Sequence, residues 1–520
     1  MLASRDRAVP ITTALRNEAG LAIELLDNGS LFAIRHGDLL VNQVLGSPVE
    51  GGLGNVYLRR RTRDGISSFP ILGPASPSRF RASGDGAVWE GSVDGLDYSC
   101  TLRLAPRQST WFWTLRLANT TARPLSLDAV LAQDLGIANE AAVRTNELYT
   151  SQYIDHAILK DEELGFLICS RQNLPQGESF PWIMHGCLHG AVGFLTDGFQ
   201  FYGLAYKASN TPAALDRRTL PNRNYQYEFA LPTLQSRRRS LAPGASGEIT
   251  FFAAFEADHA EATSIADMRH ARAAVKTFRS LGTAAIDGSA ASPPAGLFAA
   301  PVMFESHDLR AADLDRFFGS ERRHVEQRDG ALLSFFHGHQ QHVVLKAKEL
   351  LMERPTGHIM RSGRDVLPSD DILSVTAWMF GIFGSQLTIG NTSFNKLLSV
   401  CRNPLNVLKA SGQRIFVMTD RGYELLGVPS AFEMGPNSAR WIYEGERLSL
   451  AIRVDTSLDA PVCRLSVDVE RGGPLRLLVS HNIVLRPTRP DARRRPAASA
   501  TGPRTTRRPA RSSSASPRTR

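Results

Sequence analysis

Hydrophobic and polar residues alternate along much of the chain, which is the pattern of antiparallel β-strands with one buried face. Asn28-Gly29 lies between two apolar runs, and this dipeptide tolerates the positive φ angles of a tight hairpin turn. Short strands punctuated by Gly, Pro and Asn continue to about residue 257, so we predict an antiparallel β-sandwich domain over residues 10–257. The alternation is clearest at the apolar positions Tyr98, Cys100, Leu102, Leu104 and Trp111, Trp113, Leu115, Leu117.

The hydrophobic period becomes helical at residue 258. Asp258 and Glu261 resemble a capping box. The stretch TAAIDGSAASPPAG carries linker-like Gly and Pro, and a second helical stretch, DLRAADLDRFF, ends at Gly319. We therefore predict a helical linker over residues 258–330. The apolar positions of its first helix are Ile265, Met268, Ala271, Val275 and Phe278.

After the linker the sequence again has the pattern of β-strands separated by turn-forming residues, and we predict a second β-sandwich domain over residues 331–485. Residues 486–520 contain no aliphatic or aromatic side chain large enough to build a core, which predicts disorder. The expected fold class is therefore mainly β, with two antiparallel β-sandwich domains joined by a helical linker and followed by a disordered basic tail.

The net charge of +9 comes from that tail, because residues 486–520 hold eleven Arg and one Asp and the rest of the chain sums to −1. The tail arginines could bind polyanions without sequence preference, but we predict no specific nucleic-acid partner. Five scattered cysteines without a C-x-x-C pair suggest neither a disulfide scaffold nor a zinc ribbon. No apolar run is long enough for a bilayer, so we expect no membrane partner and a cytoplasmic location.

Three segments of the second β domain carry a family resemblance. LLSFFHGHQQHVVLKAKELLMERPTGHI (332–359), the segment 376–417 and LLGVPSAFEMGPNSARWIYEG (425–445) resemble the non-catalytic region of 1,2-β-oligoglucan phosphorylases. These enzymes are relatives of cellobiose phosphorylase and of the phosphorylase-like part of cyclic β-1,2-glucan synthases. The resemblance covers most of residues 10–485.

The resemblance implies N-terminal β-sandwich domains followed by an (α/α)6 barrel that holds a general-acid Asp and a phosphate site. It implies inverting phosphorolysis of β-glucan oligosaccharides by inorganic phosphate, with no catalytic metal and no organic cofactor. Nothing after Leu485 has the pattern of a helical barrel. We therefore assign no catalytic residue and expect a non-catalytic N-terminal part, truncated before its barrel.

The abrupt change after Leu485 suggests a frameshifted reading of a GC-rich gene, because such codons read out of frame give Arg, Pro, Ala, Ser, Thr and Gly. Resequencing of the locus and mass spectrometry of the tail peptides test this hypothesis. The alternative to an incomplete phosphorylase is a stand-alone carbohydrate-binding β-sandwich module.

Candidate sugar-binding residues are Trp182, Glu433, Arg440 and Trp441. Both tryptophans lie in Gly- and Pro-flanked text, where an exposed indole could stack on a glucose ring while the charged neighbours bond its hydroxyls. The alternative for both rings is packing in the core.

By their spacing, two groups of histidines could supply nitrogen ligands to a metal ion: His337, His339 and His342, and His185 with His189. Ordinary surface or hydrogen-bonded histidines are the alternative, and we predict no metal site. The adjacent acids Glu162-Glu163 and Asp370-Asp371 are expected in solvated loops, because neighbours on a strand point to opposite faces.

Overall fold

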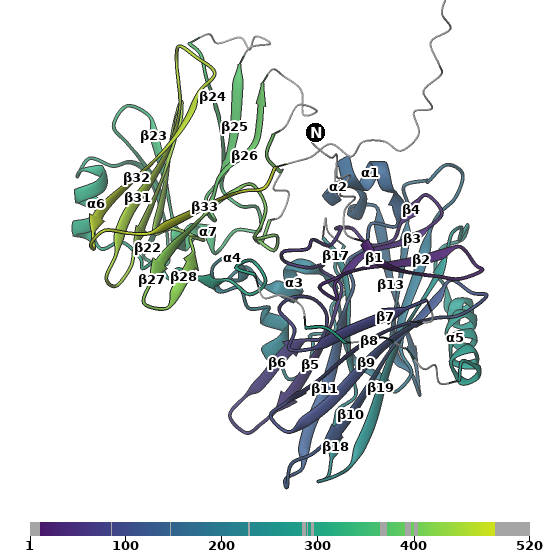
Figure 1. Cartoon of the computed structure of the whole chain (residues 1–520). Helices are drawn as coiled ribbons and strands as arrows, with labels where there is room; N and C mark the ends of the chain where they lie inside the picture. The colour runs from purple at the N-terminus through teal and green to yellow at the C-terminus, as the bar shows by residue number, and fades with distance from the viewer. Residues whose placement is uncertain are drawn as a thin grey trace, which may run out of the picture. The chain divides into compact units, whose positions relative to one another are not determined.

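The computed structural model describes residues 11–483, apart from 85, 146, 227–228, 283–285, 287, 289, 293–295, 365–371, 390–396 and 400–403. The predicted tail, 486–520, lies outside the described residues. The described chain is built mainly from β-strands in antiparallel sheets, as predicted (Figure 1). None of its helices is long and apolar enough to span a lipid bilayer.

The larger of two sheets in the first domain has fourteen strands. Its path runs through β6 (Ile66–Pro70), β5 (Asn55–Arg61), β11 (Leu125–Ala132), β17 (Ala230–Ser236), β16 (Ala191–Asp197), β14 (Gly165–Gln172), β15 (Trp182–Cys187), β19 (Ser246–Glu256), β10 (Thr110–Asn119), β9 (Leu96–Leu104), β8 (Gly86–Val93) and β7 (Arg79–Ser83). Off this path, β13 (Ile154–Asp161) pairs with β14, and β18 (Arg239–Leu241) pairs with β11.

A second sheet of this domain contains β1 (Ile11–Arg16), β2 (Leu21–Leu26), β3 (Leu31–His36), β4 (Leu39–Leu40) and β12 (Ala138–Asn139). The predicted hairpin at Asn28-Gly29 is confirmed, because β2 and β3 pair across it. Gly29 has φ +71°, and a Cβ there would lie 2.9 Å from the indole nitrogen of Trp89. That nitrogen donates to the Gly29 carbonyl at 2.8 Å, so the turn is packed directly on the core.

The alternation predicted for β9 and β10 is confirmed by their register. Trp113 lies opposite Leu102 and Leu115 opposite Cys100, and all four side chains are buried in the main core. Phe112, which points to the other face of β10, is buried as well, because the helix α5 (Met268–Ser280) covers that face. The first four residues of β10, from Thr110 to Trp113, are therefore buried on both faces of the strand.

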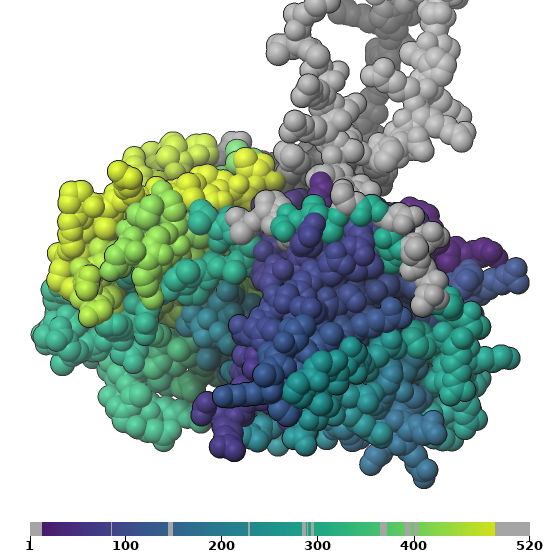
Figure 2. Space-filling model, turned by 60° about the horizontal axis from the view of Figure 1, so that its bottom comes forward, coloured from purple at the N-terminus to yellow at the C-terminus, as the bar shows by residue number. Residues whose placement is uncertain are grey.

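Helix α5 begins later than the sequence predicted. Its capping box is formed by Ser264 and Asp267 around the short 3-10 turn η2 (Ile265–Asp267), whereas Asp258 lies before it in a segment without regular secondary structure. Ile265 lies before the helix and is 71% exposed, so its assignment to the apolar face was wrong. The segment that contains α5 is at the surface of the first domain, in teal in Figures 1 and 2.

A fully buried ion pair joins two neighbouring strands of the large sheet. Arg59 on β5 lies opposite Asp128 on β11, and its Nε donates to Asp128 Oδ1 at 2.6 Å, with both side chains 0% exposed. Arg59 Nη1 also donates to the carbonyls of Leu215 and Arg217, beside the 3-10 turn η1 (Ala213–Asp216). The pair therefore fastens η1 to the sheet.

The remaining helices of the first domain are short: α1 (Glu140–Thr145), α2 (Glu147–Ser151), α3 (Gly198–Tyr202) and α4 (Tyr206–Ser209). The predicted linker region 258–330 contributes one helix to each domain. Helix α5 packs on the first domain, and α6 (Ala311–Phe318) packs on Phe335 and Val343 of the second.

Two sheets of seven strands form the second domain, which has a core between them as predicted. One contains β20 (Val302–Met303), β28 (Gly422–Leu425), β27 (Gln413–Thr419), β26 (Ile382–Ile389), β25 (Leu373–Trp378), β24 (Gly357–Arg361) and β33 (Leu477–His481). The other runs from β21 (Arg323–Arg328) through β22 (Ala331–His337), β23 (Gln341–Leu345), β29 (Ala431–Gly435), β30 (Ser438–Glu444) and β31 (Ser449–Thr456) to β32 (Cys463–Arg471). The short helix α7 (Lys346–Glu349) follows β23.

Candidate functional site

The two tryptophans predicted to stack on sugar are both 0% exposed and lie in different domains. Trp182 on β15 donates its indole N–H to Thr263 Oγ1 at 2.9 Å. Trp441 on β30 donates to the Trp378 carbonyl at 3.1 Å and packs against Phe383 and Phe432. Neither ring offers a face to solvent, and the alternative, packing in the core, describes both positions.

Glu433 and Arg440 are brought together by strand pairing. They lie opposite each other on β29 and β30, and Arg440 Nε donates to Glu433 Oε2 at 2.5 Å. His337 Nε2 lies 2.9 Å from the other carboxylate oxygen, and Arg440 also donates to the Phe317 carbonyl of α6. These polar groups connect α6 to the sheet. Their binding of sugar stays a prediction.

The two histidine patterns do not converge on a common point. His337 pairs with Glu433, His339 is exposed, and the His342 ring stacks on Phe336 with centroids 4.4 Å apart. His185 is buried inside β15, where burial lowers its pKa to about 3, while His189 Nδ1 accepts from the Thr250 amide. His337, His339 and His189 fit the interpretation of surface or hydrogen-bonded histidines. His185 does not, because neither of its buried ring nitrogens has a hydrogen-bond partner among the described residues.

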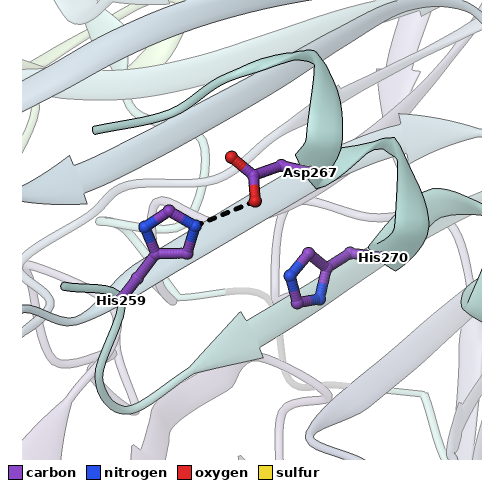
Figure 3. A group of neighbouring side chains, drawn as sticks. All are labelled: His259, Asp267 and His270. Atoms are coloured by element: carbon purple, nitrogen blue, oxygen red, sulfur yellow. Dashed lines mark hydrogen bonds and ion pairs between the residues drawn. The ribbon is translucent and has the colours of Figure 1, made fainter. Parts of the chain in front are cut away.

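One other group among the described residues has the spacing of a metal site: His259, Asp267 and His270 (Figure 3). The sequence analysis missed it. The sequence pattern Asp-x-x-His at the start of a helix could have indicated this group, since residues three apart on a helix share a face. Its third member, His259, precedes a bend that the hydrophobic pattern does not reveal.

A cavity of about 350 Å³ is lined in the first domain by Glu50, Tyr57, Tyr202 and Tyr206. Burial raises the pKa of the Glu50 carboxyl above its usual value. Aromatic rings with a few polar groups are the usual lining of small-molecule pockets of this size. Of the acid pairs, Glu162 and Glu163 are exposed in the loop between β13 and β14, and Asp370 and Asp371 lie outside the described residues.

Both β domains match known families. Residues 24–253 match the family described as "SOGP N-terminal domain", and residues 320–498 match the "Glycoside phosphorylase supersandwich domain". The chain is 33% identical over 473 residues to a 1,2-beta-oligoglucan phosphorylase of Listeria innocua serovar 6a, which covers 90% of this chain and 41% of the relative. The chain thus spans about two fifths of that relative. The predicted resemblance is confirmed.

Solved structures that resemble this chain include a bacterial glucoamylase complexed with acarbose, with a TM-score of 0.31 and 9% identity over 54% of this chain and 36% of that one. Another is a putative kojibiose phosphorylase from the human microbiome, with a TM-score of 0.26 and 7% identity over 52% of this chain and 34% of that one.

Proposed function

The chain is a phosphorylase-family protein, and from this premise we propose that its β domains are the non-catalytic N-terminal part of an inverting phosphorylase of β-1,2-linked glucooligosaccharides. The supporting observation is the alignment with the listerial 1,2-beta-oligoglucan phosphorylase, which extends over 473 residues. In the proposed reaction, phosphate attacks the anomeric carbon while a carboxylic acid protonates the leaving oxygen. The acid and the phosphate site belong to a barrel outside the two β domains.

The structure of the second domain is consistent with a supporting role. Glu433, the carboxylate among the predicted sugar-binding residues, is paired with Arg440 and His337. A general acid has to exchange its proton with a substrate oxygen within hydrogen-bond reach. A carboxylate held between two cationic or hydrogen-bonding partners is suited to fixing α6 on the sheet.

An assay of phosphorolysis tests the proposal. The purified chain is incubated with sophorose-type oligosaccharides in phosphate buffer, and α-glucose 1-phosphate is measured, with the listerial enzyme as positive control. We expect no release by this chain alone. Phosphorolysis that disappears when a carboxylate before residue 485 is replaced would contradict the proposal. Sequencing of the DNA downstream tests whether a barrel is encoded in another frame.

The second candidate function is a stand-alone carbohydrate-binding module, which the tyrosine-lined cavity favours. Isothermal titration with the same oligosaccharides separates the two. A module binds tightly, and Glu50→Gln weakens that binding at least about tenfold, because a hydrogen bond to a charged carboxylate contributes about 1.5 kcal/mol or more. The matched control is Glu178→Gln, which changes an exposed loop residue. The cytoplasmic location stays a prediction.

A further inference from the structure

The segment after β19 folds back along β15 and brings three polar side chains to the start of α5 (Figure 3). The His259 amide donates to the Phe180 carbonyl at 2.9 Å, which anchors the segment beside the sheet. The Trp182 ring stacks on the His259 ring, with centroids 5.0 Å apart and planes 12° apart. The His270 ring lies 4.9 Å from the same indole. Trp182 therefore positions both imidazoles.

The His259 ring faces an oxygen acceptor at each nitrogen. Nδ1 lies 2.7 Å from the Glu261 carbonyl, which can only accept, so Nδ1 carries a proton. Nε2 lies 3.0 Å from Asp267 Oδ1. A neutral ring protonated at Nδ1 would turn its Nε2 lone pair toward a carboxylate. Either a second proton or a cation shared by Nε2 and Oδ1 removes this repulsion.

His270 has the same arrangement with a different acceptor. Its Nδ1 lies 3.2 Å from Glu256 Oε1, which favours a proton on Nδ1. Its Nε2 is buried and has no hydrogen-bond partner among the residues that the structure describes. Metal-binding histidines usually donate one ring N–H to a carboxylate or a carbonyl and present the other nitrogen to the metal. Both imidazoles of this group satisfy that pattern.

Asp267 offers one carboxylate oxygen to the group. Its Oδ2 accepts from the Ser264 amide at 2.8 Å, and Oδ1 faces His259. The backbone therefore holds one oxygen of the carboxylate, and the other is directed at the group.

We propose that His259 Nε2, Asp267 Oδ1 and His270 Nε2 bind one Zn²⁺ ion, which clamps the 258–267 segment to the start of α5. Two imidazoles and one carboxylate are a donor set that Zn²⁺ accepts, with water completing four-coordination. One possible ligand atom from each of the three residues lies within 4.8 Å of the other two. Tetrahedral Zn²⁺ separates its ligand atoms by roughly 3.4 Å, so binding draws the His270 ring inward by on the order of 1 Å.

Two features oppose the cation. Arg269 Nη2 lies 3.3 Å from Asp267 Oδ1, and the N-terminus of α5 carries partial positive charge. The Arg269 side chain is 61% exposed and can turn into solvent when the ion binds. Replacement of Arg269 by Gln therefore increases the affinity for Zn²⁺.

The test is titration of the metal-stripped full chain with Zn²⁺ by calorimetry, and with Co²⁺ by visible absorption. We expect one ion per chain, the intense bands of four-coordinate Co²⁺, and a higher melting temperature with Zn²⁺. Glu256→Gln weakens the affinity about 10- to 100-fold because it loosens the orientation of His270. His270→Gln weakens it further.

His339→Gln is the matched control, since it makes the same change at an exposed histidine of the second domain. It leaves the affinity and the Co²⁺ bands unchanged. The near-ultraviolet circular dichroism of each metal-free variant verifies that it is folded. Absence of stoichiometric binding, or binding that survives in folded His270→Gln, overturns the assignment, and so does binding that is lost in His339→Gln.

Discussion

The buried ion pair between Arg59 and Asp128 gives the sharpest prediction about the stability of the first domain. We expect Asp128→Asn to destabilise this domain by about 3–5 kcal/mol, the cost of leaving one member of a buried pair without its opposite charge. Both side chains are 0% exposed. The carbonyls of Leu215 and Arg217 hold the Arg59 guanidinium in place, so it cannot move into solvent when its partner is neutralised.

The magnitude is large relative to the stability of a domain. Native domains are stable by about 5–15 kcal/mol, so the substitution removes roughly a third. Asp128 also pairs with Arg61, whose side chain is 18% exposed. Since that guanidinium can reach solvent, we assign most of the cost to Arg59.

Urea unfolding followed by tryptophan fluorescence measures the effect. Trp89, Trp111, Trp113 and Trp182 lie in the first domain, so most of the signal reports on its unfolding. The matched control is Glu248→Gln, because Glu248 also lies opposite an arginine on a neighbouring strand, Arg116. That pair is 61% and 33% exposed, and its loss costs less than about 1 kcal/mol.

The two midpoints decide the matter if the slopes of both transitions match the wild type. Asp128→Asn is expected to unfold at clearly lower urea than Glu248→Gln. A difference below about 1 kcal/mol between the two variants would show that the interior tolerates the unpaired guanidinium, and the reasoning from burial would be refuted.

Three further predictions concern backbone space, pH and charge. Gly165 and Gly244 both have φ +72°, but a Cβ at Gly165 would lie 2.0 Å from the Ala191 carbonyl oxygen, whereas a Cβ at Gly244 would meet none of the described atoms within 4 Å. We expect Gly244→Ala to lower the free energy of unfolding in urea by about 1–2 kcal/mol and Gly165→Ala to lower it clearly more. Equal losses would contradict this prediction. Burial lowers the pKa of His185 to about 3 and raises that of Asp197 to about 7. Between pH 7 and 5, His185 therefore takes up a proton only in the unfolded chain and Asp197 only in the folded chain. On going from pH 7 to 5, the free energy of unfolding of the wild type falls by about 2 kcal/mol relative to His185→Gln and rises by about 2 kcal/mol relative to Asp197→Asn. Urea unfolding at the two pH values measures both changes, and changes of the same sign would contradict the prediction. Deletion of residues 486–520 abolishes retention on a DNA column at low salt, and unchanged retention would place the polyanion-binding charge elsewhere.

The fold could be predicted wherever neighbours in sequence are also neighbours in structure. Trp113 and Leu115 alternate because the strand itself alternates, and the hairpin at Gly29 depends on one backbone angle. The start of α5 was misplaced because Asp258 and Ser264 are equally good caps by composition. Only the packing of Met268 and Ala271 on the sheet selects the later one.

The candidate site was less predictable because it depends on contacts between distant residues. The sequence around Trp182 predicts an exposed loop, yet β15 is a central strand that is covered by α5. Glu433 and Arg440 were chosen as sugar ligands, but hairpin register places them opposite each other, where they form an ion pair. Strand register is decided by turns and by the whole buried face, which single residues do not report.

The outermost strands of one second-domain sheet, β21 and β32, are rich in charge and largely exposed. Sequences such as RHVEQR discourage the addition of a further strand, because a partner strand would have to desolvate the charged side chains along the edge. Growth of this sheet into a continuous intermolecular ribbon is therefore unfavourable at both ends. Any interface between copies of this chain that involves the sheet has to form on its face.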